Sequence, residues 1–309
     1  MITVPDGFAR TTVDRAGAAG SAWIAELPGL AAELLERWGC VPDGEPTHGG
    51  VGLILPVRQG TGRAAVLKVS FPHPGNVHEP DAFAVWAGQG AVRLHERDDE
   101  HFAMLLERAG PATLAEVRDG DEVPTVAGRL SLRLAVPAPP GLPRLSERAT
   151  DWEARLRDDA ASLPHALSAR TVGAALATIH ELARSQPDVL VHGDLHPRNI
   201  LRAEREPWLA VDPKGYAGDR AYDGGTLLKV HTLTLLSSTD LHHTALRALD
   251  VFAEAAELDR ERTRRWAQLH AVQAAFQGRR SGFRRARGGP ELDRLIRYAD
   301  GLAEALTPT

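Results

Sequence analysis

The chain of 309 residues reads His-Gly-Asp-Leu-His-Pro-Arg-Asn at 192–199 and Val-Asp-Pro-Lys at 211–214. These two stretches place Asp194 five residues before Asn199 and eighteen before Asp212. Phosphoryl transfer needs one carboxylate that orients the attacking hydroxyl, and an amide and a second carboxylate that hold the Mg²⁺ bound to the triphosphate. The spacing therefore predicts Asp194 as the catalytic residue and Asn199 and Asp212 as Mg²⁺ ligands.

The residues after the motif have the pattern of two short strands. The apolar runs are Ile200-Leu201 and Leu209–Val211, and Glu204–Pro207 is typical of the turn between them. Asn199 would then stand at the start of the first strand and Asp212 at the end of the second. In this arrangement both side chains could point at one ion.

Two other interpretations of the motif stay open. His-Gly-Asp can be an ordinary turn, and Asp-Pro pairs are common where regular structure ends. Alternatively, His192, Asp194 and His196 could bind Zn²⁺ as alternating ligands on a strand, although no further histidine or cysteine cluster of metal-ligand spacing lies nearby. Phosphoryl transfer is favoured because three functional residue types coincide in the right order.

A phosphoryl-transfer site also needs a lysine on a strand that contacts the phosphates, and a helical glutamate that holds this lysine. Lys68 lies in the apolar run Ala64–Val69, which is the second strand of a predicted β-hairpin. A charge in such a strand is costly without a partner. Glu79, which opens a predicted helix at Glu79–Gln89, is the expected partner.

The pairing of Lys68 has two alternatives. Lysine is common on the solvent face of an edge strand, where it needs no partner. Glu33 or Glu36 could replace Glu79, although both belong to the amphipathic segment 21–38, where acidic residues usually face solvent.

A glycine-rich turn precedes the lysine hairpin. Residues 48–52 read His-Gly-Gly-Val-Gly, and the backbone N–H groups of Gly49 and Gly50 are expected to approach the phosphates of ATP. The six-residue glycine pattern of protein kinases is incomplete here. An ordinary turn explains these glycines nearly as well.

Two more strands are expected at Ala91–Leu94 and Phe102–Leu106, followed by a hinge at 107–110. The backbone groups of Glu107 and Ala109 are candidates for hydrogen bonds to adenine. This role follows from the expected architecture and not from these residue types.

The predicted elements change along the chain. Strands dominate the first third, and helical periodicity dominates from about residue 113 onward, outside the catalytic strands. Later helices are expected at 171–184, 241–258, 260–277 and 290–306, with Asp259 and Pro290 at two of their starts. The pattern predicts a two-lobed α+β fold. Residues 1–106 would form a small β-rich, nucleotide-binding lobe with an N-terminal helix, and residues 111–309 a larger, mainly helical lobe for catalysis and acceptor binding.

Lys68, Glu79, Asp194, Asn199 and Asp212 occur in an order that resembles the aminoglycoside phosphotransferases, which share the protein-kinase-like fold. Within that family the chain is similar to the branch of streptomycin 6-phosphotransferases and hydroxyurea phosphotransferases. The stretches with close counterparts in this branch are Val4–Gly7, Ala22–Ala25, Val136–Leu142 and Glu204–Pro213.

The resemblance implies an activity and its cofactors. The chain would transfer the γ-phosphoryl group of ATP, with Mg²⁺, to a hydroxyl group of a small molecule. Asp194 would act as the base, Lys68 would contact the α- and β-phosphates, and Asp223 would brace the catalytic loop. An aminocyclitol antibiotic such as streptomycin is the first acceptor expected, and hydroxyurea, a sugar or another metabolite is the alternative.

Two departures from the family bear on the acceptor. Residues 279–287 contain five arginines, which would repel a dication such as streptomycin if they lined the acceptor pocket. Charge runs usually form a solvated face, and we favour this interpretation for the arginines. Gly224–Thr226 also departs from the bulkier apolar residues expected after Asp223.

Composition limits the other classes of function. A net charge of −5 gives no general nucleic-acid footprint, so DNA binding through 279–287 is a weak alternative. No run approaches the roughly 18 apolar residues of a membrane span. The single cysteine, Cys40, excludes an intramolecular disulfide and suits the cytoplasm.

The expected partners are therefore ATP and a small hydroxyl-bearing acceptor, without nucleic acid or membrane. The sequence indicates no oligomeric state. A nucleotide-binding regulator that has lost catalysis is the alternative from another class, and the intact set of Lys68, Asp194, Asn199 and Asp212 argues against it.

Overall fold

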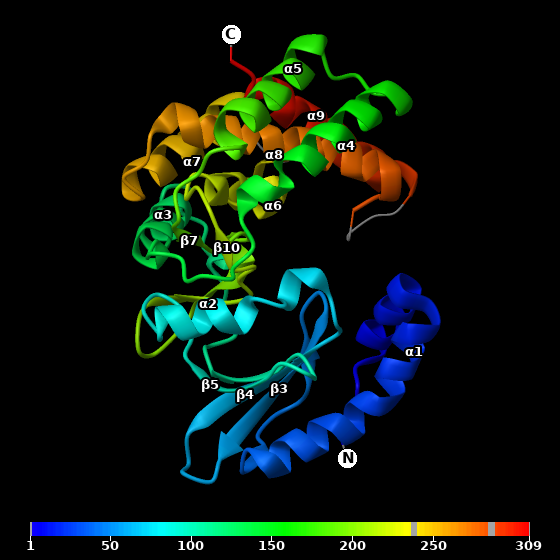
Figure 1. Cartoon of the computed structure of the whole chain (residues 1–309), viewed down its shortest axis with the longest axis vertical. Helices are drawn as coiled ribbons and strands as arrows, with labels where there is room; N and C mark the ends of the chain where they lie inside the picture. The colour runs from blue at the N-terminus through cyan, green and yellow to red at the C-terminus, as the bar shows by residue number, and fades with distance from the viewer. Residues whose placement is uncertain (1, 236–239, 284–287, 309) are drawn as a thin grey trace. The chain divides into compact units, whose positions relative to one another are not determined.

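The computed structural model describes residues 2–235, 240–283 and 288–308, with the backbone alone at 229–235. The chain forms two compact units (Figure 1). The first unit contains Met1–Gly110 and Ala203–Leu209, and the second contains Pro111–Arg202 and Ala210–Thr309. The first unit contains the large sheet together with helices, and the second unit is mainly helical, so the predicted α+β class is confirmed.

A six-stranded antiparallel sheet organises the first unit. Its order is β1 (Cys40–Pro42), β3 (Gly52–Gln59), β4 (Ala64–Ser70), β6 (Ala103–Glu107) and β5 (Leu94–Asp98), with β2 (Thr47–His48) also paired to β3. In β4, Leu67 and Val69 are fully buried in one core with Leu27 and Leu34 of α1 (Asp6–Arg37). Because side chains alternate along a strand, Lys68 points to the opposite face of the sheet.

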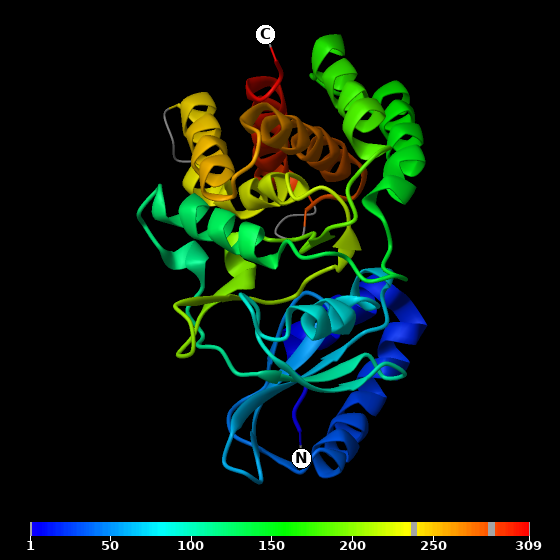
Figure 2. The same ribbon diagram turned by 60° about the vertical axis from the view of Figure 1, so that its left-hand side comes forward.

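Helix α1 is longer than predicted. It begins at Asp6 instead of near residue 21, and a non-helical glycine, Gly17, divides it into two stretches. Figures 1 and 2 show both stretches, in blue, beside the sheet. Phe8 of the first stretch is fully buried in the same core as Leu27. The first stretch was missed because it has few apolar residues to mark a helical period.

The segment between α2 (Glu79–Trp86) and β5 differs from the prediction. Helix α2 ends at Trp86, since Ala87 has the left-handed conformation that terminates helices. The strand predicted at Ala91–Leu94 was wrong, because β5 begins only at Leu94. Ala91 and Val92 are buried, so their apolar character reflects a packed loop.

Seven helices form most of the described part of the second unit. They are α3 (Glu122–Leu134), α4 (Ala149–Ser162), α5 (Ala169–Thr178), α6 (Tyr222–Leu235), α7 (Leu241–Ala255), α8 (Arg260–Ser281) and α9 (Gly289–Ala305). Helix α8 packs against α5, α6, α7 and α9, and Trp266, Leu269 and Phe276 along it are fully buried. It is therefore the central helix of this core.

The predicted helix boundaries hold to within a few residues for α7, α8 and α9. Asp259 caps α8 by accepting a hydrogen bond from the N–H of Arg262 at 2.7 Å, and Pro290 lies in the first turn of α9, both as predicted. The helix predicted at 171–184 is α5 followed by a wider helical turn at Ile179–Ala183.

The remaining elements are short. Strand β7 (Leu190–Val191) pairs with β10 (Tyr216–Ala217), and β8 (Ile200–Arg202) and β9 (Trp208–Ala210) are the two strands predicted after the motif. Turns of 3₁₀ helix lie at Pro74–Asn76, Leu114–Glu116, Leu145–Arg148 and Pro197–Asn199. Among the described helices, none has the length and apolarity that crossing a membrane would need.

Candidate active site

The motif at 192–199 forms a tight loop after β7. Gly193 has a φ of 80°, and a Cβ atom there would lie 2.7 Å from a ring carbon of Tyr216 and 3.1 Å from the Cβ of Lys214. Both the left-handed backbone and the close approach of β10 therefore require glycine.

His192 is the buried centre of this loop. Its Nε2–H donates to the carbonyl oxygen of Val211 at 3.0 Å, and its Nδ1 accepts the N–H of Asp194 at 3.3 Å. Burial lowers the pKa of His192 to about 4, although the charges of Asp194 and Asp212 oppose this shift. The imidazole is therefore neutral, with its proton on Nε2.

This arrangement corrects the Zn²⁺ alternative. Both ring nitrogens of His192 are engaged with the protein, so neither is available to a metal ion. No group of three histidine, cysteine, aspartate or glutamate side chains within 2–235, 240–283 and 288–308 is placed to hold a metal.

Further hydrogen bonds join the two stretches of the motif. The N–H of Lys214 donates to the carbonyl oxygen of His192 at 2.7 Å, and the N–H of Val211 donates to that of Asn199 at 2.9 Å. Together with the bond from the His192 side chain to Val211, they fix the second stretch against the first. The loop containing Asp212 is thus held to the loop containing Asp194.

The three predicted phosphoryl-transfer residues lie within this network. The Nδ2 of Asn199 donates to the backbone carbonyl of Asp194 at 3.0 Å, which leaves Oδ1 as the acceptor end of the amide. Asp212 has a φ of 59°, a conformation that is uncommon for residues other than glycine and often occurs at functional sites. The Nζ of Lys214 lies 3.3 Å from the Oδ2 of Asp212.

Asp223 braces the loop, as predicted. Its Oδ2 accepts a hydrogen bond from the N–H of His192 at 3.1 Å, and its Oδ1 accepts one from the N–H of Gly193 at 2.9 Å. The residue is 2% exposed.

The glycines that follow Asp223 are explained by the close packing of two helices. A Cβ on Gly225 would lie 2.7 Å from the ring of His270, so α6 and α8 can pack this closely only with glycine there.

In the first unit, Lys68 pairs with Glu79. The Nζ of Lys68 lies 2.5 Å from the Oε1 of Glu79, and the side chains are 8% and 1% exposed. Strand β4 is not an edge strand, because it lies between β3 and β6. The alternatives of a solvent-facing lysine and of pairing with Glu33 or Glu36 were therefore wrong.

The glycine-rich stretch forms the turn between β2 and β3. The N–H of Gly49 donates to the carbonyl oxygen of Gly52 at 2.9 Å, and Arg15 of α1 donates to the carbonyl oxygen of Gly50 at 3.0 Å. The binding of phosphates by Gly49 and Gly50 stays a prediction.

Glu107 stands at the end of β6. Its N–H donates to the carbonyl oxygen of Arg93 at 2.8 Å and is therefore already used. A hydrogen bond from adenine would have to be accepted by the carbonyl oxygen of Glu107. Its carboxylate accepts two hydrogen bonds from Arg205, at 2.9 and 2.8 Å. Burial would raise the pKa of Glu107, but these bonds hold it below its usual value. The adenine roles of Glu107 and Ala109 stay predictions.

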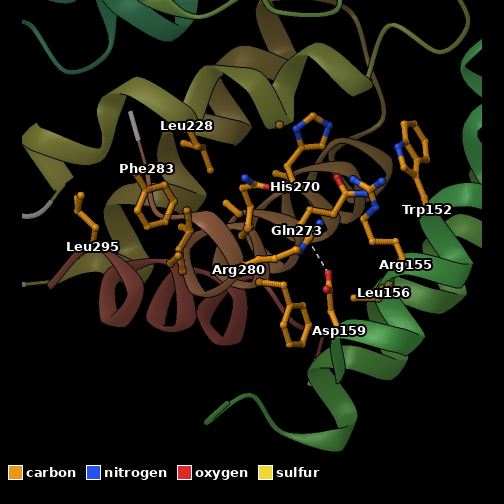
Figure 3. A pocket seen from close by; sticks show the side chains of 18 of the residues that line it. Trp152, Arg155, Leu156, Asp159, Leu228, His270, Gln273, Arg280, Phe283 and Leu295 are labelled. Atoms are coloured by element: carbon orange, nitrogen blue, oxygen red, sulfur yellow. Dashed lines mark hydrogen bonds and ion pairs between the residues drawn. The ribbon is translucent and has the colours of Figure 1, made fainter. Parts of the chain in front are cut away.

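The second unit also contains a cavity of about 640 Å³ that sequence reasoning did not find (Figure 3). Residues of α4, α6, α8 and α9 line it, together with Arg148, Arg198 and Phe283. Arg280 of α8 lines the cavity and pairs with Asp159 of α4 at 2.7 Å.

The predicted solvated face holds for Arg280, which is exposed, and is wrong for Arg279. The guanidinium of Arg279 makes two hydrogen bonds to the carboxylate of Asp300, and its side chain is only 12% exposed. Arg280 is paired and lines the cavity. Arg284, Arg285 and Arg287 lie outside the described residues.

Comparison with known proteins identifies the family. The sequence model of the aminoglycoside/hydroxyurea antibiotic resistance kinases matches residues 37–282. The chain belongs to this family. A streptomycin 6-kinase of Streptomyces griseus is 36% identical over 274 residues, which cover 88% of this chain and 89% of the relative. A hydroxyurea phosphotransferase of Kitasatospora aureofaciens is 36% identical over 277 residues, which cover 88% and 79%.

A solved structure supports the fold of this antibiotic resistance kinase. An amicoumacin kinase in complex with AMP-PNP and Ca²⁺ has a TM-score of 0.60 and 13% identity, over 90% of this chain and 95% of that one. At this identity the likeness shows the kinase-like fold alone. The predicted family resemblance and fold are both confirmed.

Proposed function

We propose that this kinase transfers the γ-phosphoryl group of ATP to a hydroxyl group of a small antibiotic. The observation that carries the proposal is the hydrogen-bonded network that holds Asp194, Asn199 and Asp212 in two adjoining loops. The relatives are named as phosphotransferases of streptomycin and of hydroxyurea, which supports the same type of reaction here.

Asn199 and Asp212 are the residues that would hold Mg²⁺. Both offer hard oxygen donors, the Oδ1 of Asn199 because its Nδ2 is already used, and the carboxylate of Asp212. When bound, the ion neutralises negative charge on the triphosphate. Two protein ligands suit Mg²⁺, which usually takes its other ligands from phosphate and water.

Asp194 would orient the acceptor hydroxyl and accept its proton as the new O–P bond forms. Its backbone is held by the bonds to His192 and Asn199, and the Nε2 of His196 lies 3.8 Å from its Oδ2. Lys214 adds a positive charge beside Asp212 and would stabilise the charge on the transferred phosphoryl group.

In the first unit, Lys68 would contact the α- and β-phosphates. A buried lysine needs a partner that fixes its position, and Glu79 supplies it. Of the two glycines predicted to contact the phosphates, Gly50 would supply its backbone N–H, because the N–H of Gly49 already donates to Gly52. Glu107 and Ala109 would contact adenine. We also propose the cytoplasm as the location, because ATP is available there.

An acceptor screen tests this proposal. Release of ADP would be measured with streptomycin, hydroxyurea, hexoses and uronic acids, for the wild type and for Asp194→Asn. Acceptor-dependent release that the substitution removes would support the proposal. If the protein binds ATP and no acceptor stimulates ADP release, the regulator without catalysis becomes the better account.

A further inference from the structure

The cavity of the second unit adjoins the catalytic loop. Arg198 of the motif lines it, and so does Tyr222, which directly precedes the bracing residue Asp223. The carboxylate of Asp223 in turn accepts hydrogen bonds from the N–H groups of His192 and Gly193, which directly precede Asp194. An acceptor held in this cavity would therefore lie beside the carboxylate that receives its proton under the proposed function.

The cavity has the size and the walls of a site for a drug-sized molecule. Its volume of about 640 Å³ falls within the range of about 300–1,000 Å³ typical of such sites. Leu156, Leu228, Phe283 and Leu295 contribute apolar surface (Figure 3). Trp152 stacks on Tyr222 with ring planes 9° apart, which gives one wall a flat aromatic face.

The charged groups of the cavity are mainly positive. Arg148, Arg155 and Arg198 line it, and within the described residues none of the three lies within ion-pair distance of a carboxylate. Two acidic residues, Asp151 and Asp159, also line the cavity. The charge of Asp159 is neutralised by Arg280, so Asp151 alone opposes the three arginines. The local balance is therefore positive, although the whole chain has a net charge of −5.

These arginines are not equivalent. Arg148 already donates to the hydroxyl of Tyr216 at 2.6 Å and lies over the ring of Trp152. Arg155 and Arg198 have no such partner among the described residues. A guanidinium group binds carboxylates and phosphates through paired donors, so these two are suited to an acidic group on a ligand.

We propose that the acceptor of this kinase is a hydroxyl-bearing molecule with an apolar ring system and an acidic group, and not a polycationic aminoglycoside. The inference rests on the proposed function, because it assigns the cavity to the acceptor of that reaction. A polycation would meet uncompensated positive charge at Arg155 and Arg198, whereas an acidic group would meet its complement there.

A matched pair of ligands tests the proposal. 4-Nitrophenyl β-D-glucuronide and 4-nitrophenyl β-D-glucoside share an aromatic ring and sugar hydroxyls, and only the first has a carboxylate. Titration calorimetry without ATP should show the glucuronide binding about 10- to 100-fold more tightly than the glucoside, the range for a hydrogen bond to a charged group. Streptomycin should bind more weakly than either.

Variants of the two arginines locate the effect. Arg155→Gln and Arg198→Gln should each reduce the preference for the glucuronide. Arg157→Gln should leave the preference unchanged. Arg157 lies on α4 like Arg155, but it pairs with Glu153 and does not line the cavity. Tighter binding of streptomycin, absence of glucuronide binding, or a preference that survives both arginine substitutions would overturn the inference.

The same experiment separates this inference from the proposed function. If the glucuronide binds in an arginine-dependent way and no acceptor stimulates ADP release, the kinase activity fails while the ligand class of the cavity stands. If streptomycin binds most tightly and is phosphorylated, the kinase activity stands and the inference about the cavity fails.

Discussion

The Nε2–H of His192 donates a hydrogen bond to the carbonyl oxygen of Val211 at 3.0 Å. This bond links the residue two positions before Asp194 to the residue before Asp212. One buried, neutral side chain thus holds the predicted catalytic loop against the predicted metal-binding loop. The geometry of the site depends on this contact and on the two hydrogen bonds that Asp223 accepts from the loop.

Neutral His192 should make the folding stability depend on pH. Its pKa is about 4 in the folded chain, against 6.5 for an ordinary histidine, so the unfolded chain takes up a proton first as the pH falls. Its contribution is fully present above about pH 6.5 and should decrease by about 3 kcal/mol on reaching pH 4. Urea unfolding across this range measures the effect. The control is His192→Gln, whose amide N–H can keep the bond to Val211 without titrating. Equal slopes for both proteins would contradict the prediction.

Lys68→Met should reduce both stability and activity. It leaves the buried carboxylate of Glu79 without its cation, which typically costs about 3–5 kcal/mol. The double variant Lys68→Met/Glu79→Leu should recover most of this stability and remain inactive, because the phosphates still lack their lysine. Urea unfolding and ADP release measured on the same samples separate the two effects. Activity that returns with stability in the double variant would show that Lys68 has only a structural role.

Asp223→Ala should destabilise the chain by about 2–5 kcal/mol, because two buried N–H groups lose their acceptor. It should also lower kcat by at least about 10-fold, since small displacements of catalytic groups are costly. Asp223→Asn keeps one carbonyl acceptor, so its stability and its kcat should lie between those of the wild type and those of Asp223→Ala.

The matched control for Asp223 is Asp259→Ala. Removing this helix cap should cost about 1 kcal/mol with no change in kcat. If Asp223→Ala and Asp259→Ala both reduce kcat in proportion to their loss of stability, Asp223 has only a general structural role and does not position the loop.

Gly225→Ala should destabilise the second unit by about 1–3 kcal/mol, because the added methyl group would meet the ring of His270. Gly173 of α5 provides the contrast, since a Cβ there would meet no atom within 4 Å. Gly173→Ala should stabilise the helix by about 0.5–1 kcal/mol. Thermal unfolding of the two variants gives the comparison, and equal effects of the same sign would refute the packing argument.

Much of the candidate site could be predicted because its signals are local in sequence. Asp194, Asn199 and Asp212 follow one another at a recognisable spacing, and Glu79 opens a helix eleven residues after Lys68. The pairs that were missed join distant segments. Arg280 and Asp159 are 121 residues apart and Arg205 and Glu107 are 98 apart, so no local pattern could connect them.

The cavity was missed for the same reason. Its walls come from four helices that only the folded core brings together, and each contributes residues that look like ordinary core positions. The interpretation as a solvated face failed for Arg279 because a charge run does not reveal ion-pair partners that lie far away in the sequence, and Arg280 also has such a partner. Asp300 and Asp159 are those partners.

The most direct test of the account is the turnover of Asp194→Ala with Mg-ATP and an acceptor that the wild type phosphorylates. The account predicts that kcat falls by about 10²–10⁴-fold, the usual size of a general-base contribution, while Mg-ATP binds with unchanged affinity. Turnover close to that of the wild type would contradict the assignment of Asp194, and with it the interpretation of the two loops as a phosphoryl-transfer site.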